Sequence, residues 1–426
     1  MSRGRRLLTV VLALLCALIP GPVRAALLGH GGPVKGIAVS ADGSHAVTAG
    51  FDYSVIVWNL ADETILHRLQ GHDGPVNAVA MTANGAVAVS ASDDGSVAIW
   101  DLATGTLRQR LRTEAKLGAV AISPDEAEIV AGGWDGQVHR WRLADGSPLP
   151  SLANGGERAT ALAFTAGALL VGGHEGSLRI WDRAGGAARQ VPAHDFALTG
   201  VAALTGGVVL TASIDRTLRR WGPSLDAWTA ELAGHEQPVL AVAASRDGSR
   251  IASAGAKGEV LLWDGEASHP DLVLAGAGPA IWSLAFKPDG ERLLGGGADG
   301  AVRVWDTATG ALLGQPLPQA HSQAAGRGPE LFAKCSACHT LTADGGNKAG
   351  PPLAGLFGRR AGSVATYAYS PALRESNIVW TEETVARLFD VGPDRFVPGS
   401  KMPLQRLSNP RDRTDLIAYL KRMGGG

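Results

Sequence analysis

Two cysteines and a histidine that stand close together are the residues of this chain best suited to chemistry. Cys335, Cys338 and His339 occur in the order C-x-x-C-H within the stretch FAKCSACHTLT. This spacing is compatible with a disulfide, a redox-active dithiol, a zinc site or the attachment point of a c-type haem. The surrounding sequence has to separate these alternatives.

Features around the motif favour haem attachment. A thioredoxin-like dithiol needs a strand before a helix in an α/β pattern, and no such pattern surrounds the motif. A zinc site needs further Cys or His ligands, and none occurs after His339. In a c-type haem the two thiols add across the vinyl groups, and the adjoining histidine lies beneath the iron. A disulfide between the two cysteines remains an alternative, because the chain begins with an export signal, described below, and exported cysteines commonly form disulfides.

Met402 is the candidate for the second axial ligand. It lies 63 residues after His339 in the sequence VPGSKMP, whose Pro, Gly and polar residues are poor surroundings for a core side chain. Of the other methionines beyond the N-terminal segment, Met81 falls in a strand pattern and Met423 in the C-terminal tail. Ligation by His and Met raises the haem potential and suits electron transfer. An iron ligated in this way has no open position, which disfavours both peroxide chemistry and haem-based sensing.

Residues ahead of the motif form seven repeats. Each repeat holds a Trp, and successive Trp residues are 40 to 42 positions apart: Trp58, Trp100, Trp141, Trp181, Trp221, Trp263 and Trp305. Four repeats also hold a His about 28 positions earlier: His30, His72, His194 and His235. Within each repeat, apolar and small residues alternate over four short segments separated by turn residues, which predicts four β-strands.

The repeats resemble the WD-repeat family. Four of them contain the Trp-Asp pair itself, in sequences such as SDDGSVAIWD and GADGAVRVWD. The resemblance covers residues 27–317 and implies a seven-bladed, all-β propeller with four strands per blade. It also implies a hydrogen-bonded set of structural residues in each blade. In the second blade this set would be His72, Ser90, Asp94 and Trp100.

Some repeats depart from this pattern. The third, fourth and seventh lack the His, and the sixth has Lys257 where Asp is expected, so we expect these four to lose part of the hydrogen-bonded set. Two segments could supply the strand that closes the ring. One is GALLGQPL, residues 310–317, and the other is AALLGH, residues 25–30.

The C-terminal part resembles class I cytochromes c of the mitochondrial type. The matching text runs in order through CSACH, GPPLAGLFGRRAGSVATYAYS, NIVW, FVPGSKMP and DLIAYLKR, over residues 328–423. The resemblance implies a small all-α domain in which a first helix, residues 329–338, crosses a last helix, residues 410–422. The residues expected to meet at this crossing are Gly328, Phe332, Leu416 and Tyr419.

The same resemblance implies which residues hold one covalently bound haem c. Cys335 and Cys338 would form the thioethers, His339 and Met402 would ligate the iron, and Pro351 would support His339 through a neighbouring carbonyl. The further haem contacts implied by the family are Arg359, Tyr369 and Trp380, as hydrogen-bond donors to the propionates, and Ser400, near the methionine loop. Buried carboxylates need such polar partners.

The first 25 residues have the form of a secretory signal peptide. Three Arg residues precede an apolar run of 13 residues, 7–19, and the segment ends with a small residue at Ala25. A run of this length is too short to span a bilayer, which takes about 20 residues. We therefore expect a periplasmic protein, cleaved near Ala25 and without stable membrane insertion. The predicted organisation is a signal peptide at 1–25, a propeller at 26–317, a linker at 318–327 and a cytochrome c domain at 328–426.

Charge is divided unevenly between the two predicted modules. Residues 329–426 carry 13 basic and 9 acidic side chains, a net charge of +4, whereas residues 26–328 carry a net charge of −9. Complementary charge favours either docking of the modules on each other or the recruitment of different partners; the alternative is solvated surface charge without a role.

These observations predict a periplasmic electron carrier rather than an enzyme. The propeller would be a protein-docking scaffold, and the partners would be redox proteins of the respiratory or periplasmic electron-transfer chain, with no nucleic acid involved. The alternative is an oxidoreductase whose propeller binds a substrate or a second cofactor while the haem accepts electrons. The repeats contain no clustered metal ligands or cofactor motif that favours this alternative.

Overall fold

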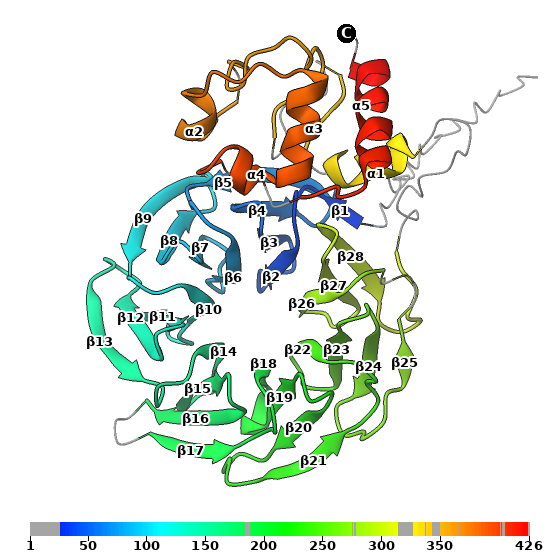
Figure 1. Ribbon diagram of the computed structural model, residues 1–426. Helices are drawn as coiled ribbons and strands as arrows, with labels where there is room; N and C mark the ends of the chain where they lie inside the picture. The colour runs from blue at the N-terminus through cyan, green and yellow to red at the C-terminus, as the bar shows by residue number, and fades with distance from the viewer. Residues whose placement is uncertain are drawn as a thin grey trace, which may run out of the picture.

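The computed structural model consists of a ring of seven four-stranded antiparallel sheets followed by a small helical domain (Figure 1). The predicted multidomain fold is therefore confirmed. The structure describes residues 26–183, 188–274, 276, 278–313, 327–336, 338–342, 350–365, 367–400, 402 and 405–424. The predicted signal peptide, residues 1–25, and residues 318–326 of the predicted linker lie outside the described residues.

Blades one to four each run, in chain order, from the centre of the ring to its outer edge. Blade one comprises β2 (Val34–Val39), β3 (His45–Gly50), β4 (Ser54–Asn59) and β5 (Thr64–Gln70). Blade two comprises β6 (Val76–Met81), β7 (Val87–Ser92), β8 (Ser96–Asp101) and β9 (Thr106–Arg112). Blade three comprises β10 (Leu117–Ile122), β11 (Glu128–Gly133), β12 (Gln137–Arg142) and β13 (Pro148–Ala153). Blade four comprises β14 (Ala159–Phe164), β15 (Ala168–Gly173), β16 (Ser177–Asp182) and β17 (Arg189–Pro192).

The remaining blades complete the ring. Blade five comprises β18 (Leu198–Ala203), the short 3-10 turn η1 (Thr205–Gly207), β19 (Val209–Ser213), β20 (Leu218–Trp221) and β21 (Trp228–Leu232). Blade six comprises β22 (Val239–Ala244), β23 (Arg250–Gly255), β24 (Val260–Asp264) and β25 (Leu272–Val273). Blade seven comprises β26 (Ile281–Phe286), β27 (Arg292–Gly297), β28 (Ala301–Asp306) and β1 (Ala26–Leu28).

The ring is closed by its own N-terminal strand. β1 pairs antiparallel with β28, with Leu27 opposite Val302, so the start of the chain supplies the outer strand of blade seven. Of the two segments that could close the ring, the structure thus selects the N-terminal one. In the described part of the other segment, Leu312 forms a single bridge to Trp305. The seven sheets therefore form a continuous ring in which the two ends of the repeat region are joined.

Truncation of Leu27 is expected to weaken this closure. The side chain of Leu27 is 1% exposed and packs between blades seven and one, so Leu27→Ala should lower the free energy of unfolding by about 2–4 kcal/mol. Urea denaturation followed by tryptophan fluorescence measures this change. The neighbouring Leu28 is 52% exposed, and Leu28→Ala should stay within about 0.5 kcal/mol. Equal effects of the two substitutions would contradict the closure.

The periodic tryptophans form the core between adjacent blades. Trp100 of blade two is 1% exposed and packs against Val47 and Val57 of blade one. The same relation recurs around the ring, for example between Trp58 of blade one and Val304 of blade seven. Burying a large aromatic side chain at each junction supplies much of the apolar contact between sheets. The spacing of 40 to 42 residues between successive tryptophans thus corresponds to one blade of the ring.

The hydrogen-bonded set predicted in blade two is present. The Nδ1 of His72 lies 3.0 Å from a carboxylate oxygen of Asp94, and its Nε2 lies 2.7 Å from the Oγ of Ser90. Trp100 donates from its Nε1 to the same Oγ at 2.8 Å. Corresponding sets are formed in blades one, five and six by the following histidines: His30, His194 and His235.

The expectation for blade six was wrong, because a nearby residue replaces the missing Asp. Glu259, two positions after Lys257, places its carboxylate 3.2 Å from the Nδ1 of His235. In blade four, by contrast, the set is incomplete as expected. The Nε1 of Trp181 is buried and has no hydrogen-bond partner within the described residues.

The helical domain is built around two crossing helices. Its helices are α1 (Gly328–Ser336), α2 (Pro371–Arg374), α3 (Glu382–Val391), α4 (Pro393–Phe396) and α5 (Pro410–Gly424). Gly328 of α1 lies against Tyr419 of α5 so closely that a Cβ at this position would overlap it. The rings of Phe332 and Tyr419 are 5.6 Å apart, and Leu416 is buried in the same core. The predicted crossing of the first and last helices is therefore observed.

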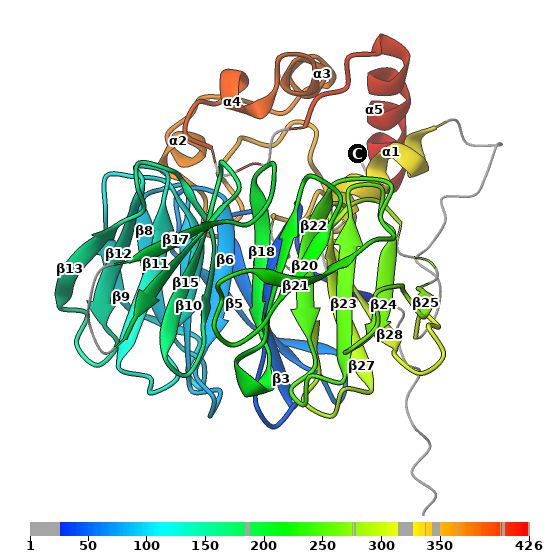
Figure 2. The same cartoon turned by 90° about the horizontal axis from the view of Figure 1, so that it is seen from below.

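The helical domain lies over one face of the propeller (Figure 2). It sits at the edge of the ring, above blade one and near β1 (Figure 1). In the part of the chain that the structure describes, no helix is long and apolar enough to cross a membrane.

Candidate functional site

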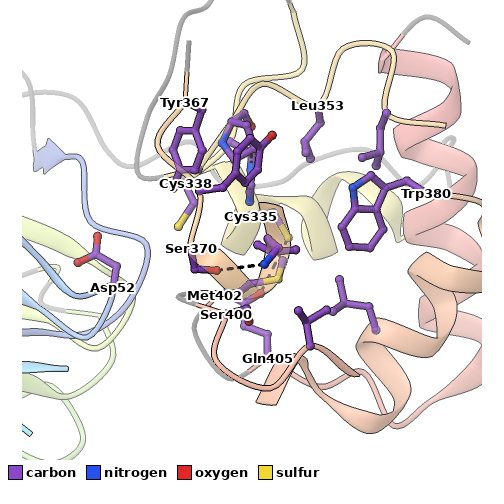
Figure 3. A pocket seen from close by; sticks show the side chains of 18 of the residues that line it. Asp52, Cys335, Cys338, Leu353, Tyr367, Ser370, Trp380, Ser400, Met402 and Gln405 are labelled. Carbon is purple, nitrogen blue, oxygen red and sulfur yellow. Dashed lines mark hydrogen bonds between the residues drawn. The ribbon is translucent and has the colours of Figure 1, made fainter. Parts of the chain in front are cut away.

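The nine residues singled out in the sequence surround one cavity of the helical domain (Figure 3). The cavity opens to solvent, and about 1460 Å³ of space in it, open solvent included, is not occupied by protein atoms. The nine lining residues are Cys335, Cys338, His339, Pro351, Arg359, Tyr369, Trp380, Ser400 and Met402. They come from α1, from the loops before α2 and α3, and from the loop before α5. Residues up to 67 positions apart in the sequence are thus brought to a single site.

The end of α1 positions the cysteines and the histidine. Cys338 and His339 both donate their backbone N–H groups to the carbonyl of Cys335, at 3.0 and 2.8 Å, which turns the chain sharply after the helix. The Nδ1 of His339 lies 2.7 Å from the carbonyl oxygen of Pro351. A carbonyl can only accept, so Nδ1 carries the proton and Nε2 is the ring nitrogen able to ligate a metal. A Cβ on Gly350 would overlap the imidazole, which shows how closely this loop encloses His339.

The donor set and the lining of the cavity fit a haem. Two thiols, one imidazole and one thioether are the groups needed for two covalent links and two axial ligands. Cys335 and Met402 both pack against the hydrophobic core of the domain. The cavity is otherwise lined mainly by apolar side chains: Leu353, Leu356, Leu373, Val385, Leu388, Phe389, Val397 and Leu420. An apolar site of this kind excludes water and accommodates a macrocycle.

Helix α3 forms part of the cavity wall through Val385, Leu388 and Phe389. Thr381 caps its N-terminus by accepting from the N–H of Thr384, and the side chain of Thr384 returns a bond to Thr381. This capping box fixes where the helix begins. The helix then directs Val385, Leu388 and Phe389 into the domain core, where each is less than 9% exposed.

Polar residues lie at the rim of the cavity. Arg359 donates from Nη1 to the carbonyl of Ala354 and from Nη2 to that of Pro352, both at 2.8 Å, so it braces the loop that encloses His339. The rings of Tyr367 and Tyr369 are 4.8 Å apart in an edge-to-face arrangement. Burial raises the pKa of Tyr369, and burial raises the pKa of Tyr367 to about 12. Both hydroxyls therefore stay protonated at neutral pH and can donate hydrogen bonds.

The propeller supplies part of the cavity wall, which the sequence motifs did not indicate. Its contribution consists of Asp52 and Tyr53 from the loop between β3 and β4, Gln70 at the end of β5, and His72 from the loop between β5 and β6. Figure 3 shows Asp52 facing the side of the cavity on which Cys338 lies. Burial would raise the pKa of Asp52, but the contact with His30 and the other bonds lower it to about 2, so this wall carries a carboxylate.

Comparison with known proteins identifies both modules. A family described as "Cytochrome c" matches residues 325–424. A second, described as "WD domain, G-beta repeat", matches residues 21–59, 63–101, 105–142, 228–264 and 270–306. Residues 143–227, which include blade four and the first three strands of blade five, fall outside these matches, and the structure gives both blades the same four-stranded form.

Relatives of the helical domain match it over nearly their whole length. A protein named cytochrome c from Gibberella zeae is 45% identical over 96 residues, which are 22% of this chain and 90% of that protein. A cytochrome c from Arabidopsis thaliana is 45% identical over 96 residues, 22% of this chain and 85% of that protein. A cytochrome c from Chlamydomonas reinhardtii is 44% identical over 97 residues, 22% of this chain and 86% of that protein.

Proposed function

The chain belongs to the cytochrome c family through its C-terminal domain, and from this premise we propose that it is a periplasmic one-electron carrier whose WD-repeat propeller docks other proteins. As a cytochrome c, it is an electron-transfer protein with a haem cofactor. The proposal adds that the chain binds one haem, that this haem is attached covalently, and that the chain is exported before the haem is attached. It also adds that the partners belong to the respiratory or periplasmic electron-transfer chain.

One observation carries the proposal. Cys335, Cys338, His339 and Met402 lie around a single apolar cavity, and they are the groups needed to hold a haem on both faces. When bound, the haem supplies a one-electron couple of its iron. His339 and Met402 would hold the iron from its two faces, and the site would then have no coordination position for a substrate.

The other residues of the site tune and protect this couple. Pro351 holds the proton of His339 on Nδ1, which orients the ring and makes it a stronger ligand. The apolar side chains on α3 keep water away from the cavity. The hydroxyls of Tyr367 and Tyr369 remain neutral, so they can stabilise haem carboxylates by donating hydrogen bonds.

The described strand β1, Ala26–Leu28, lies after the residue at which we expect the signal peptide to be cleaved. Cleavage there would leave the strand that closes the propeller complete. Thioether formation also suits this compartment, where structural thiols otherwise become oxidised.

Analysis of the purified periplasmic fraction tests the proposal. We expect a mature N-terminus at Ala26, one haem per chain that survives denaturation, and reversible reduction by one electron. The isolated propeller should contain no stoichiometric cofactor of its own. A tightly bound second cofactor there, together with oxidation of a small substrate, would instead favour the oxidoreductase. Recovery of the chain only from the cytoplasm would contradict export.

A further inference from the structure

A single glycine of the propeller lies directly against Cys338 of the helical domain. Gly31, in the loop before β2, is buried although it lies on the surface loop of a blade. A Cβ atom added to Gly31 would overlap the Sγ of Cys338 and would lie 3.2 Å from the Cβ of Cys338. Gly31 does not have a positive φ, so its backbone conformation does not require glycine. Glycine is required because the Sγ of Cys338 occupies the space that a Cβ atom would take.

Among the four blades that have the structural His, only blade one has a glycine directly after it. In the three other blades with the structural His, the next residue is acidic: Asp73, Asp195 and Glu236. The backbone position is equivalent, because the N–H of Gly31 donates to Asp52 at 2.8 Å as the N–H of Asp73 donates to Asp94 at 2.8 Å. Of these four blades, the one that carries the helical domain is thus the one that lacks the acidic side chain.

Loss of the acidic residue also changes the partners of an arginine. In blade two, Arg110 donates to Asp73 at 3.0 Å and also pairs with Asp94. The corresponding Arg68 in blade one lies 3.8 Å from Asp52 and donates to the carbonyl of Gly29 at 2.8 Å.

Arg68 lies at this contact, since it is only 15% exposed and lies near Tyr367 of the helical domain. The overall charges of the two modules, −9 for residues 26–328 and +4 for residues 329–426, favour the same contact.

We propose that blade one is a dedicated seat for the chain's own cytochrome domain, with Gly31 as the residue that admits Cys338, and that this docking closes the Cys338 side of the haem cavity to other proteins. The inference rests on the proposed function, in which Cys338 bears a thioether and so holds one edge of the haem. A protein that exchanges electrons at this edge has to compete with the propeller. The remaining blades, which keep the acidic residue or lack the His, are left for other partners.

The test restores the repeat pattern with Gly31→Asp in the haem-loaded full-length protein. An acidic residue at this position is native to three other blades, so the propeller should fold, and Gly31→Ala provides a smaller second variant. Asp195→Gly, the reverse exchange in blade five, is the matched control. Hydrogen exchange of peptides over residues 29–33 should become at least about 10-fold faster in Gly31→Asp, and should not change in the control.

A kinetic measurement tests the closure separately. Each variant is oxidised and mixed with a separately purified reduced cytochrome c, which gives up the single electron that this chain gains. The second-order rate constant should rise several-fold in Gly31→Asp, whereas reduction by ascorbate, a small molecule, should change less.

The outcomes distinguish the two proposals. Unchanged hydrogen exchange in both Gly31 variants would contradict the proposal that blade one is the seat of the cytochrome domain. Faster hydrogen exchange with an unchanged rate constant for electron transfer from the reduced cytochrome c would contradict the proposal that docking closes the Cys338 side of the cavity. If hydrogen exchange behaves as expected but no redox protein reacts with any variant, the docking stands and the electron-carrier function fails.

Discussion

Replacing Cys335 and Cys338 together with serine is expected to abolish covalent haem attachment. Each thiol can form one thioether, so the double variant has no group left that could bond to a vinyl carbon. After denaturing electrophoresis, haem staining at the position of the chain should be lost completely. Each single substitution leaves one link and should give reduced but detectable staining.

The chain offers a matched control for this experiment. Cys16→Ser changes the third cysteine, which lies in the predicted signal peptide and outside the described residues, and it should leave haem staining at the native level. Covalent haem in the double serine variant would contradict the assignment of the motif. Loss of staining after Cys16→Ser would instead show that export or processing had been disturbed.

The ring of seven blades could be predicted because its signals are local and repeated. Each Trp fills the junction between neighbouring blades, so the same residue is needed at every turn of the ring. The set formed by His72, Ser90 and Asp94 likewise lies within one blade. A sequence period reports such packing directly, since each repeat meets the same physical requirement.

Closure of the ring could not be predicted in the same way. The segments 25–30 and 310–317 both contain the same short apolar sequence, ALLG, and either could pair with the edge of blade seven. The choice depends on which end of the chain reaches β28 in space. Burial of Leu27 against blade one settles it, and this contact joins residues from opposite ends of the repeat region.

The haem-binding residues could be predicted from local sequence motifs, whereas the part of the cavity wall that the propeller supplies could not. The C-x-x-C-H motif and the loop around Met402 are chemical signals in the sequence, and the structure brings both to one cavity. Contact of Asp52 and Tyr53 with that cavity depends on how two separately folded modules are placed, which no local pattern encodes. The exchange of an acidic residue for Gly31 was the one signal available, and it is visible only when the repeats are compared with each other.

Replacing Met402 with alanine is expected to open one face of the haem to added ligands. In the native protein, an external ligand has to displace the bound thioether, whereas in Met402→Ala it meets a vacated position. The affinity of the ferric protein for imidazole, measured by absorbance titration, should therefore rise by at least about 100-fold. The reduction potential should fall, because thioether ligation favours the ferrous state.

Two further variants separate ligation from packing. Met423→Ala removes a methionine that is 50% exposed on α5, and it should bind imidazole as weakly as the native protein. Met402→His supplies another ligand at the same position, so its imidazole affinity should stay low while its potential falls. Met402 also contacts the hydrophobic core, and a purely structural role would loosen the domain without these opposite responses. If Met402→Ala and Met402→His bind imidazole equally well, Met402 is a packing residue and the iron has another sixth ligand.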